Sequence, residues 1–158
     1  MLILGIDPGT ARMGLGVVEK NGHDPRFVFA TCVETSMETS AGDRLMFLGD
    51  ELSKILQKYN PDVACVEQLF FGINARTAIA VGQARGVILA TLARHKVPQV
   101  LEYQGLSVKH ALTGFGRADK KQMQEMVRVH LGLREVPKPD DCADALAAAI
   151  TYALMSKV

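Results

Sequence analysis

Two short apolar runs in this chain each end at a carboxylate. Residues 2–6 (LILGI) precede Asp7, and residues 63–66 (VACV) precede Glu67. Short apolar runs bounded by turn residues are typical of buried strands. The chain is therefore expected to fold in the α/β class, with acidic side chains at the ends of two interior strands.

A second pair of acids lies near the C-terminus. Asp141 and Asp144 are three residues apart at the start of an alanine-rich segment, so they share one face of the predicted helix. Three distant elements that end in acid can meet at one edge of a sheet, where oxygen ligands suit Mg²⁺ or Mn²⁺. Two such ions together catalyse phosphodiester hydrolysis.

Each acid also has a simpler interpretation. Asp7, followed by Pro8 and Gly9, could begin a turn. Glu67 could be a solvated strand end, and Asp140 with Asp141 could cap the last helix. Asp144 is harder to explain this way, because residues 145–150 (ALAAAI) leave that helix apolar over much of its surface. Taken together, the four acids favour a metal site.

Length and composition restrict the class of protein. A chain of 158 residues with 48% apolar residues is expected to form a single domain over residues 1–158. It has no apolar run of the roughly 20 residues that span a membrane, so we expect a cytoplasmic protein. The three cysteines, Cys32, Cys65 and Cys142, lack CxxC spacing, which favours reduced thiols over zinc or disulfides.

The basic residues are concentrated in the middle of the chain. Residues 70–138 carry 11 basic and 4 acidic side chains, against 6 and 10 in residues 1–69. A basic stretch by itself usually forms solvated helix faces. Beside an acidic metal cluster it has another interpretation, because a polyanion needs cationic surroundings to approach a negative site.

The periodicity predicts strands first and helices later. Residues 2–7, 13–19 and 27–34 are expected to form a three-stranded meander. Ser40 and Asp43 resemble a capping box for a helix that ends before Pro61. A strand at 62–67, a helix at 74–95 and a strand at 99–103 predict a parallel right-handed crossover. Helices at 107–112, 119–131 and after the proline-rich link complete the domain.

The predicted helix at 74–95 is rich in small residues. Gly82 and Gly86 lie one turn apart on one face, and each costs about 1 kcal/mol against alanine in a helix interior. Such glycines indicate that another backbone comes close. Either the chain's own sheet or a second subunit could provide it.

Three segments resemble the RuvC family of Holliday-junction resolvases: GIDPGTARMGLGVV, VEQLFFGINARTAIAVGQARG and PDDCADALAAAIT. Their order and spacing match the family over nearly the whole chain. The resemblance implies a ribonuclease-H-like fold, with a five-stranded mixed sheet flanked by helices, in a homodimer. It also implies symmetric nicking of a four-way DNA junction with divalent metal, two Mg²⁺ per subunit or Mn²⁺, in recombination and repair. A branch-migration motor is an implied partner.

The resemblance assigns roles to particular residues. Asp7, Glu67, Asp141 and Asp144 match the four catalytic, metal-binding carboxylates, and the Asp-x-x-Asp-Ala-Leu spacing selects Asp141 over Asp140. Lys109 and Lys120 resemble phosphate-contacting lysines, with Lys120 also catalytic, and Phe70 resembles an aromatic residue that stacks on unpaired bases. Additional expected DNA contacts are Phe71, Arg76 and Lys121, and the expected dimer contacts are Gly82 and Gly86.

Other functions share parts of this pattern. Asp7-Pro8-Gly9-Thr10 also resembles the phosphate loop of actin-like ATPases and sugar kinases, although 158 residues supply neither a second domain nor a second such loop. A non-catalytic junction-binding module would need the basic segment but not four acids. A nuclease for another structured nucleic acid, such as an RNA–DNA hybrid, is the remaining alternative.

Overall fold

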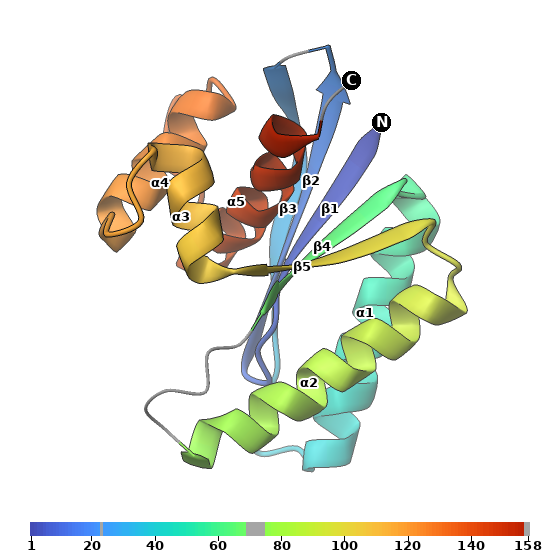
Figure 1. Cartoon of the computed structure of the whole chain (residues 1–158). Coiled ribbons are helices and arrows are strands. Elements are labelled where there is room, and N and C mark those ends of the chain that lie inside the picture. Colours follow the sequence, from blue (N-terminus) through green and yellow to red (C-terminus); the bar gives the residue numbers. More distant parts are fainter. Residues whose placement is uncertain (23, 69–74, 157–158) are drawn as a thin grey trace.

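A five-stranded mixed sheet organises the protein (Figure 1). The computed structural model describes the chain except for residues 23, 69–74 and 157–158, and the side chains of residues 75–77. The strands are β1 (Leu2–Asp7), β2 (Arg12–Asn21), β3 (Asp24–Glu34), β4 (Val63–Gln68) and β5 (Gln99–Gln104), in the spatial order β3-β2-β1-β4-β5. The antiparallel β1–β2–β3 meander and the parallel β4–β5 crossover are confirmed. Because β1 and β4 are also parallel neighbours, both end at the same edge.

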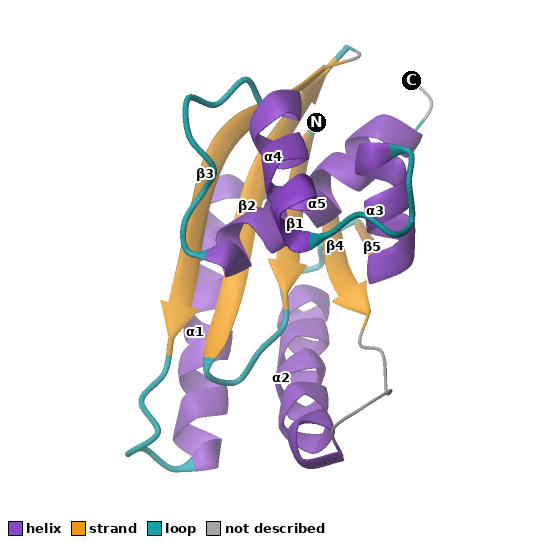
Figure 2. Cartoon of the chain, turned by 90° about the vertical axis from the view of Figure 1, so that its left-hand side faces the viewer, coloured by secondary structure: helices purple, strands orange, loops and turns teal. Residues whose placement is uncertain are grey.

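Helices cover both faces of the sheet. Helices α1 (Ala41–Tyr59) and α2 (Ala75–Arg94) pack on one face, and α3 (Gly105–Thr113), α4 (Lys120–His130) and α5 (Asp140–Met155) pack on the other. Figure 2 shows α1 behind the sheet and α3, α4 and α5 in front of it. The apolar residues form two cores, one under each group of helices, so the predicted mixed sheet flanked by helices is confirmed.

The last helix lies directly on the backbone of the central strands. A Cβ atom at Gly5 would lie 1.8 Å from the carbonyl oxygen of Ala145, and one at Gly14 would lie 2.0 Å from that of Asp141. Only glycine permits this approach of helix to strand. The N-terminal turns of α5, with their acids, are thereby held against the edge where β1 ends.

The helix starts differ in part from expectation. Ser40 caps α1 by accepting the backbone N–H of Asp43, but the Asp43 carboxylate accepts the Ser40 hydroxyl at 2.7 Å. Ser40–Asp43 is therefore only half of a capping box, because the aspartate side chain is too short to reach back comfortably to the Ser40 N–H. A complete capping box is formed by Asp119 and Gln122 at the start of α4.

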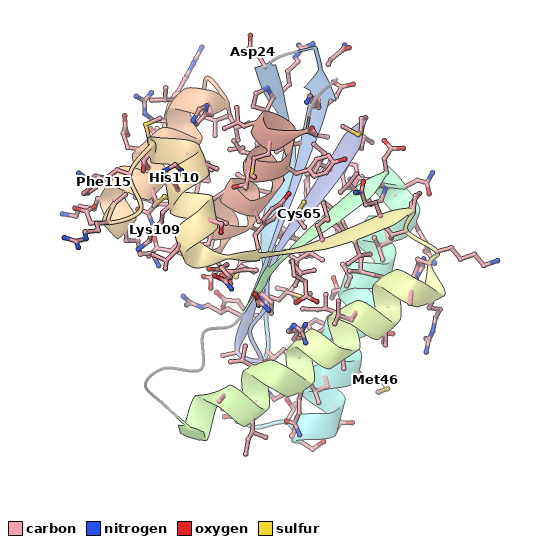
Figure 3. The ribbon with its side chains drawn as sticks, viewed as in Figure 1. Asp24, Met46, Cys65, Lys109, His110 and Phe115 are labelled. Carbon is pink, nitrogen blue, oxygen red and sulfur yellow. The ribbon has the colours of Figure 1, made fainter. Side chains whose placement is uncertain are left out.

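The three cysteines are unpaired, as their spacing predicted. Burial raises the pKa of the Cys65 thiol, at the centre of the sheet in Figure 3, to about 12. None of the helices in the described part of the chain is long and apolar enough to cross a membrane.

Candidate active site

Three elements bring four carboxylates to one edge of the sheet. Asp7 is the last residue of β1, and Glu67 follows Val66, which pairs with Ile6 in the parallel β1–β4 register. Asp141 and Asp144 lie in the first two turns of α5, which begins beside Asp7 because Gly14 admits the helix backbone. Pro139 is the N-cap of α5 and no side chain caps that helix, so Asp140 and Asp141 are not capping residues.

Burial and mutual repulsion dominate the electrostatics of this edge. Burial, then the charges of Glu67, Asp144 and Asp141, raises the pKa of Asp7 to about 8. Burial and the charge of Asp144 also raise the pKa of Glu67, which is partly offset by Lys109 and by a hydrogen bond with Asp7. Burial likewise raises the pKa of Asp144. Asp7 and Glu67 are therefore neither a simple turn residue nor a solvated strand end.

Two cations hold the acids of α5. Lys120 Nζ lies 3.0 Å from Asp140 and 3.6 Å from Asp144. On the other side, an Arg12 guanidinium nitrogen lies 4.0 Å from Asp141 Oδ2. Among the described residues, no three His, Cys, Asp or Glu side chains converge closely enough to hold a metal ion in this arrangement. Each α5 acid is instead drawn toward a basic side chain.

The donor set nevertheless fits a hard divalent cation. The four site acids offer only carboxylate oxygens, which Mg²⁺ and Mn²⁺ prefer, and they come from a rigid sheet edge and a packed helix. Burial first, and then the charges of the other three acids, raise the pKa of Asp7 in this arrangement. A cation offsets both burial and repulsion, so binding it would favour the ionised form of Asp7, Glu67 and Asp144.

Two adjoining depressions open onto this edge. They share Glu67, Gly105 and Lys109; the first also includes Lys120 and Asp144, and the second Asp7, Pro8 and Leu106. Figure 3 shows Lys109 on α3, on the side of the sheet that carries α4 and α5. Asp7, Glu67, Asp144 and both lysines that the sequence singled out thus line these adjoining depressions, whereas Asp141 lines neither.

The remaining predicted contacts have different positions. Lys121 lines a separate depression beside Phe115, so Lys120 is the lysine at the acids. In the part of the chain that the structure describes, a Cβ added at Gly82 or Gly86 would meet nothing within 4 Å beyond its own helical turns, so α2 does not use these glycines to pack on its own sheet. Phe70 and Phe71 lie outside the described residues, as does the side chain of Arg76.

Sequence reasoning missed two features of the site. Arg12 pairs with both Glu34, at 3.3 Å, and Asp141. The sequence feature that could have revealed Arg12 is a basic residue at the start of the strand that follows Asp7. Gly105 is the other feature, because a Cβ there would lie 3.1 Å from Glu67 Oε1. A larger residue at 105 would press on that carboxylate, which no pattern in the sequence indicates.

Comparison with known proteins identifies the family. A family model described as crossover junction endodeoxyribonuclease RuvC matches residues 3–152. A relative of that name from Roseiflexus sp. (strain RS-1) is 55% identical over 152 residues, which cover 95% of this chain and 90% of the relative. A Caldicellulosiruptor saccharolyticus relative is 48% identical over 157 residues, 99% of this chain and 94% of the relative.

Solved structures agree with the sequence comparison. The Thermus thermophilus RuvC structure superposes with a TM-score of 0.90 at 38% identity, covering 98% of this chain and 94% of that chain. T. thermophilus RuvC in complex with Holliday junction substrate gives a TM-score of 0.88 at 35% identity, with the same coverage. The yeast mitochondrial Holliday junction resolvase, at 16% identity and a TM-score of 0.69, shares the fold.

This chain belongs to the RuvC family of crossover junction endodeoxyribonucleases. The predicted family, its ribonuclease-H-like fold and the enzyme class are thereby confirmed. The match extends over nearly the whole length of these relatives and does not favour the alternative of an actin-like ATPase fragment.

Proposed function

We propose that this protein resolves four-way DNA junctions by a pair of symmetric nicks, as a homodimer that uses two divalent metal ions per subunit. The observation that carries the proposal is the position of Asp7, Glu67, Asp141 and Asp144 at one edge of the sheet, near Lys109 and Lys120. Family membership and the T. thermophilus complex with a Holliday junction substrate support the choice of DNA substrate. The wider role is in homologous recombination and DNA repair.

The four carboxylates would hold the metal ions, with Mg²⁺ as the first candidate and Mn²⁺ as the second. Bound there, the ions supply an activated water and charge stabilisation for the leaving 3′-oxygen. The chain contributes the placement of the acids. Asp7 and Glu67 are fixed by strand pairing and Asp141 by helix packing, so their backbones need not move when substrate arrives.

Lys120 would add charge stabilisation at the phosphate. Its ammonium lies at one side of the acids, and the hydrogen bond with Asp140 raises the pKa of Lys120, so the group stays cationic. Lys109 lines both depressions beside Glu67 and would contact a phosphate of the bound strand. A cation that faces the transition state accelerates the step, whereas one that faces a distant phosphate only strengthens binding.

Phe70 would stack on an unpaired base near the crossover, with Phe71, Arg76 and Lys121 as further DNA contacts. Stacking is worth about 1–3 kcal/mol per base, which is enough to favour a partly opened crossover. Two subunits related by a two-fold axis match the near two-fold symmetry of the junction, which explains paired nicks.

The outward side of α2 would form the dimer contact. Gly82 and Gly86 lie one turn apart with open space beyond them in the described structure, and the exposed Ile79 lies on the same helix. Glycines on an outward face allow a second backbone to approach closely. A branch-migration motor is proposed as a partner through family membership alone.

The decisive experiment compares synthetic four-way junction, matched duplex and RNA–DNA hybrid, each with and without Mg²⁺, with an ATP hydrolysis assay beside them. We expect metal-dependent paired nicks in the junction and ligatable ends. Equal cutting of duplex or hybrid would contradict junction selectivity. Binding without metal-dependent cutting would instead favour the non-catalytic junction-binding module.

A further inference from the structure

Arg12 occupies a position at the acid cluster that matches that of Lys120. Lys120 contacts one site acid, Asp144, and one acid outside the set of four, Asp140. Arg12 contacts one site acid, Asp141, and one acid outside the set, Glu34. The two site acids of α5 are therefore each contacted by a basic side chain that has a second carboxylate as its anchor.

The backbone that carries Arg12 is fixed by neighbouring segments. The Thr35 N–H donates to the carbonyl of Ala11 at 3.0 Å, and the Thr35 hydroxyl donates to the carbonyl of Thr10 at 2.6 Å. Arg44 from α1 in turn donates to the Thr35 hydroxyl at 2.8 Å. The turn between Asp7 and Arg12 is thus tied to the end of β3 and to α1.

The guanidinium itself remains accessible. The Arg12 side chain is 55% exposed and that of Glu34 is 60% exposed, whereas that of Asp141 is 22% exposed. An exposed ion pair of this kind contributes little to stability, so a purely structural role explains little. Arginine presents a planar fork of donors that fits phosphate oxygens, and it can keep one carboxylate while it engages a phosphate.

We propose that Arg12, anchored by Glu34, contacts a backbone phosphate of the bound DNA strand on the Asp141 side of the site, opposite Lys120. The inference rests on the proposed junction-binding function and adds a residue to it. With Glu34 as its anchor, Arg12 can turn its remaining donors from Asp141 to the substrate, and a divalent cation at the α5 acids would favour this exchange. The strand would then lie between two cations, which fixes its position relative to the carboxylates.

Binding of a synthetic four-way junction in EDTA, without cleavage, measures this contact directly. We compare wild type with Arg12→Gln over 0.05–0.3 M salt and use Arg26→Gln as the matched control. Arg26 is also an exposed arginine of the meander, but it lies near Asp24 at the opposite end of β3 (Figure 3). Both changes remove one positive charge.

For Arg12→Gln we expect about a tenfold weaker affinity at 0.1 M salt for each phosphate that the side chain no longer binds, a difference that shrinks toward 1 M salt. The salt slope should fall by about 1 per phosphate, while Arg26→Gln changes neither quantity to this extent. Arg12→Lys should retain the slope because it keeps the charge. Equal behaviour of Arg12→Gln and Arg26→Gln would overturn the inference.

Neutral methylphosphonates placed one at a time beside the cut provide a second measurement. At one position the wild type should lose affinity while Arg12→Gln does not. If Arg12→Gln fails to fold, Arg12→Lys replaces it, with a smaller penalty expected at that position than in wild type. The phosphate contact would be refuted if no methylphosphonate position showed such a difference between wild type and variant. If wild type shows no preference for junction over duplex, the proposed function fails whatever the outcome for Arg12. Failure of the proposed function can therefore be distinguished from failure of the Arg12 contact.

Discussion

Replacing Asp7 by Asn should make the metal-free protein more stable and at the same time abolish nicking. Burial and three nearby carboxylates raise the pKa of Asp7 from 3.8 to about 8. Because the folded state binds this proton more tightly than the unfolded chain, the contribution to stability is complete below about pH 4 and is lost as the pH rises through 8. Asparagine is neutral at every pH and can donate to Glu67 as the protonated aspartate does.

The magnitude follows from that shift. Roughly four pKa units at about 1.4 kcal/mol each set a ceiling of about 6 kcal/mol at pH 8. Glu67 and Asp144 share the same proton equilibria, and side-chain rearrangement relieves part of the repulsion, so we expect about 2–4 kcal/mol. For a chain of 158 residues this corresponds to a rise in Tm of about 5–15 °C.

Thermal and urea unfolding in EDTA between pH 5 and pH 8.5 would measure the effect. The stability difference between Asp7→Asn and wild type should grow as the pH rises. Added Mg²⁺ should stabilise wild type more than the variant, which has lost one ligand charge. Junction binding should remain nearly intact, because the basic surface is unchanged. A variant that is less stable than wild type at pH 8 in EDTA, or that nicks normally, would refute the reasoning.

Three further outcomes are expected. Lys120→Ala should slow single-turnover cleavage by about 10²-fold with a much smaller loss of junction affinity, whereas Lys121→Ala, at a proposed DNA contact away from the acids, should lower affinity more than the cleavage rate; equal losses in rate and affinity would make Lys120 a binding residue. Gly82→Leu and Gly86→Leu should shift a dimer toward monomer in light scattering, and a monomeric wild type at micromolar concentration would contradict the interface. Phe70→Ala should slow cleavage of a fully paired junction, with recovery when the crossover carries unpaired bases; a large fall in Tm without recovery would indicate a core residue.

The sequence predicted those parts of the site that depend on strand ends. Asp7 and Glu67 could be expected at one edge because two short apolar runs each end in acid, whereas the parallel pairing of β1 with β4 that brings them there is a finding of the structure. Asp144 could be assigned to the site because a single acid in the second turn of a largely apolar helix is hard to explain as a structural residue. These inferences need only periodicity and chain direction.

The partners of the acids could not be predicted in this way. If the β2–β3 hairpin were regular from its Asn21↔Asp24 pair, Arg12 would face Val33. The irregularity between Val17 and Val18 shifts the register, so that Arg12 pairs with Glu34. A bulge of this kind leaves no clear mark in the hydrophobic pattern. The choice between Lys120 and Lys121 was also undetermined, because adjacent helical residues point about 100° apart and the direction depends on how α4 packs.

Helix α5 carries two of the mutually repelling site acids and also the apolar residues that keep the helix packed on the sheet. From Cys142 to Ala153, α5 buries ten residues in the core, and its first turn contacts the backbone of Gly14 without an intervening side chain. Repulsion among four carboxylates therefore cannot be relieved by moving the helix away, because that would expose the apolar residues and open a gap over β1 and β2. Relief must come from side-chain rotation toward a cation. In this structure the cations are the side chains of Arg12 and Lys120. Metal binding would therefore require the acids to exchange these ion-pair partners for the metal, with no movement of the backbone.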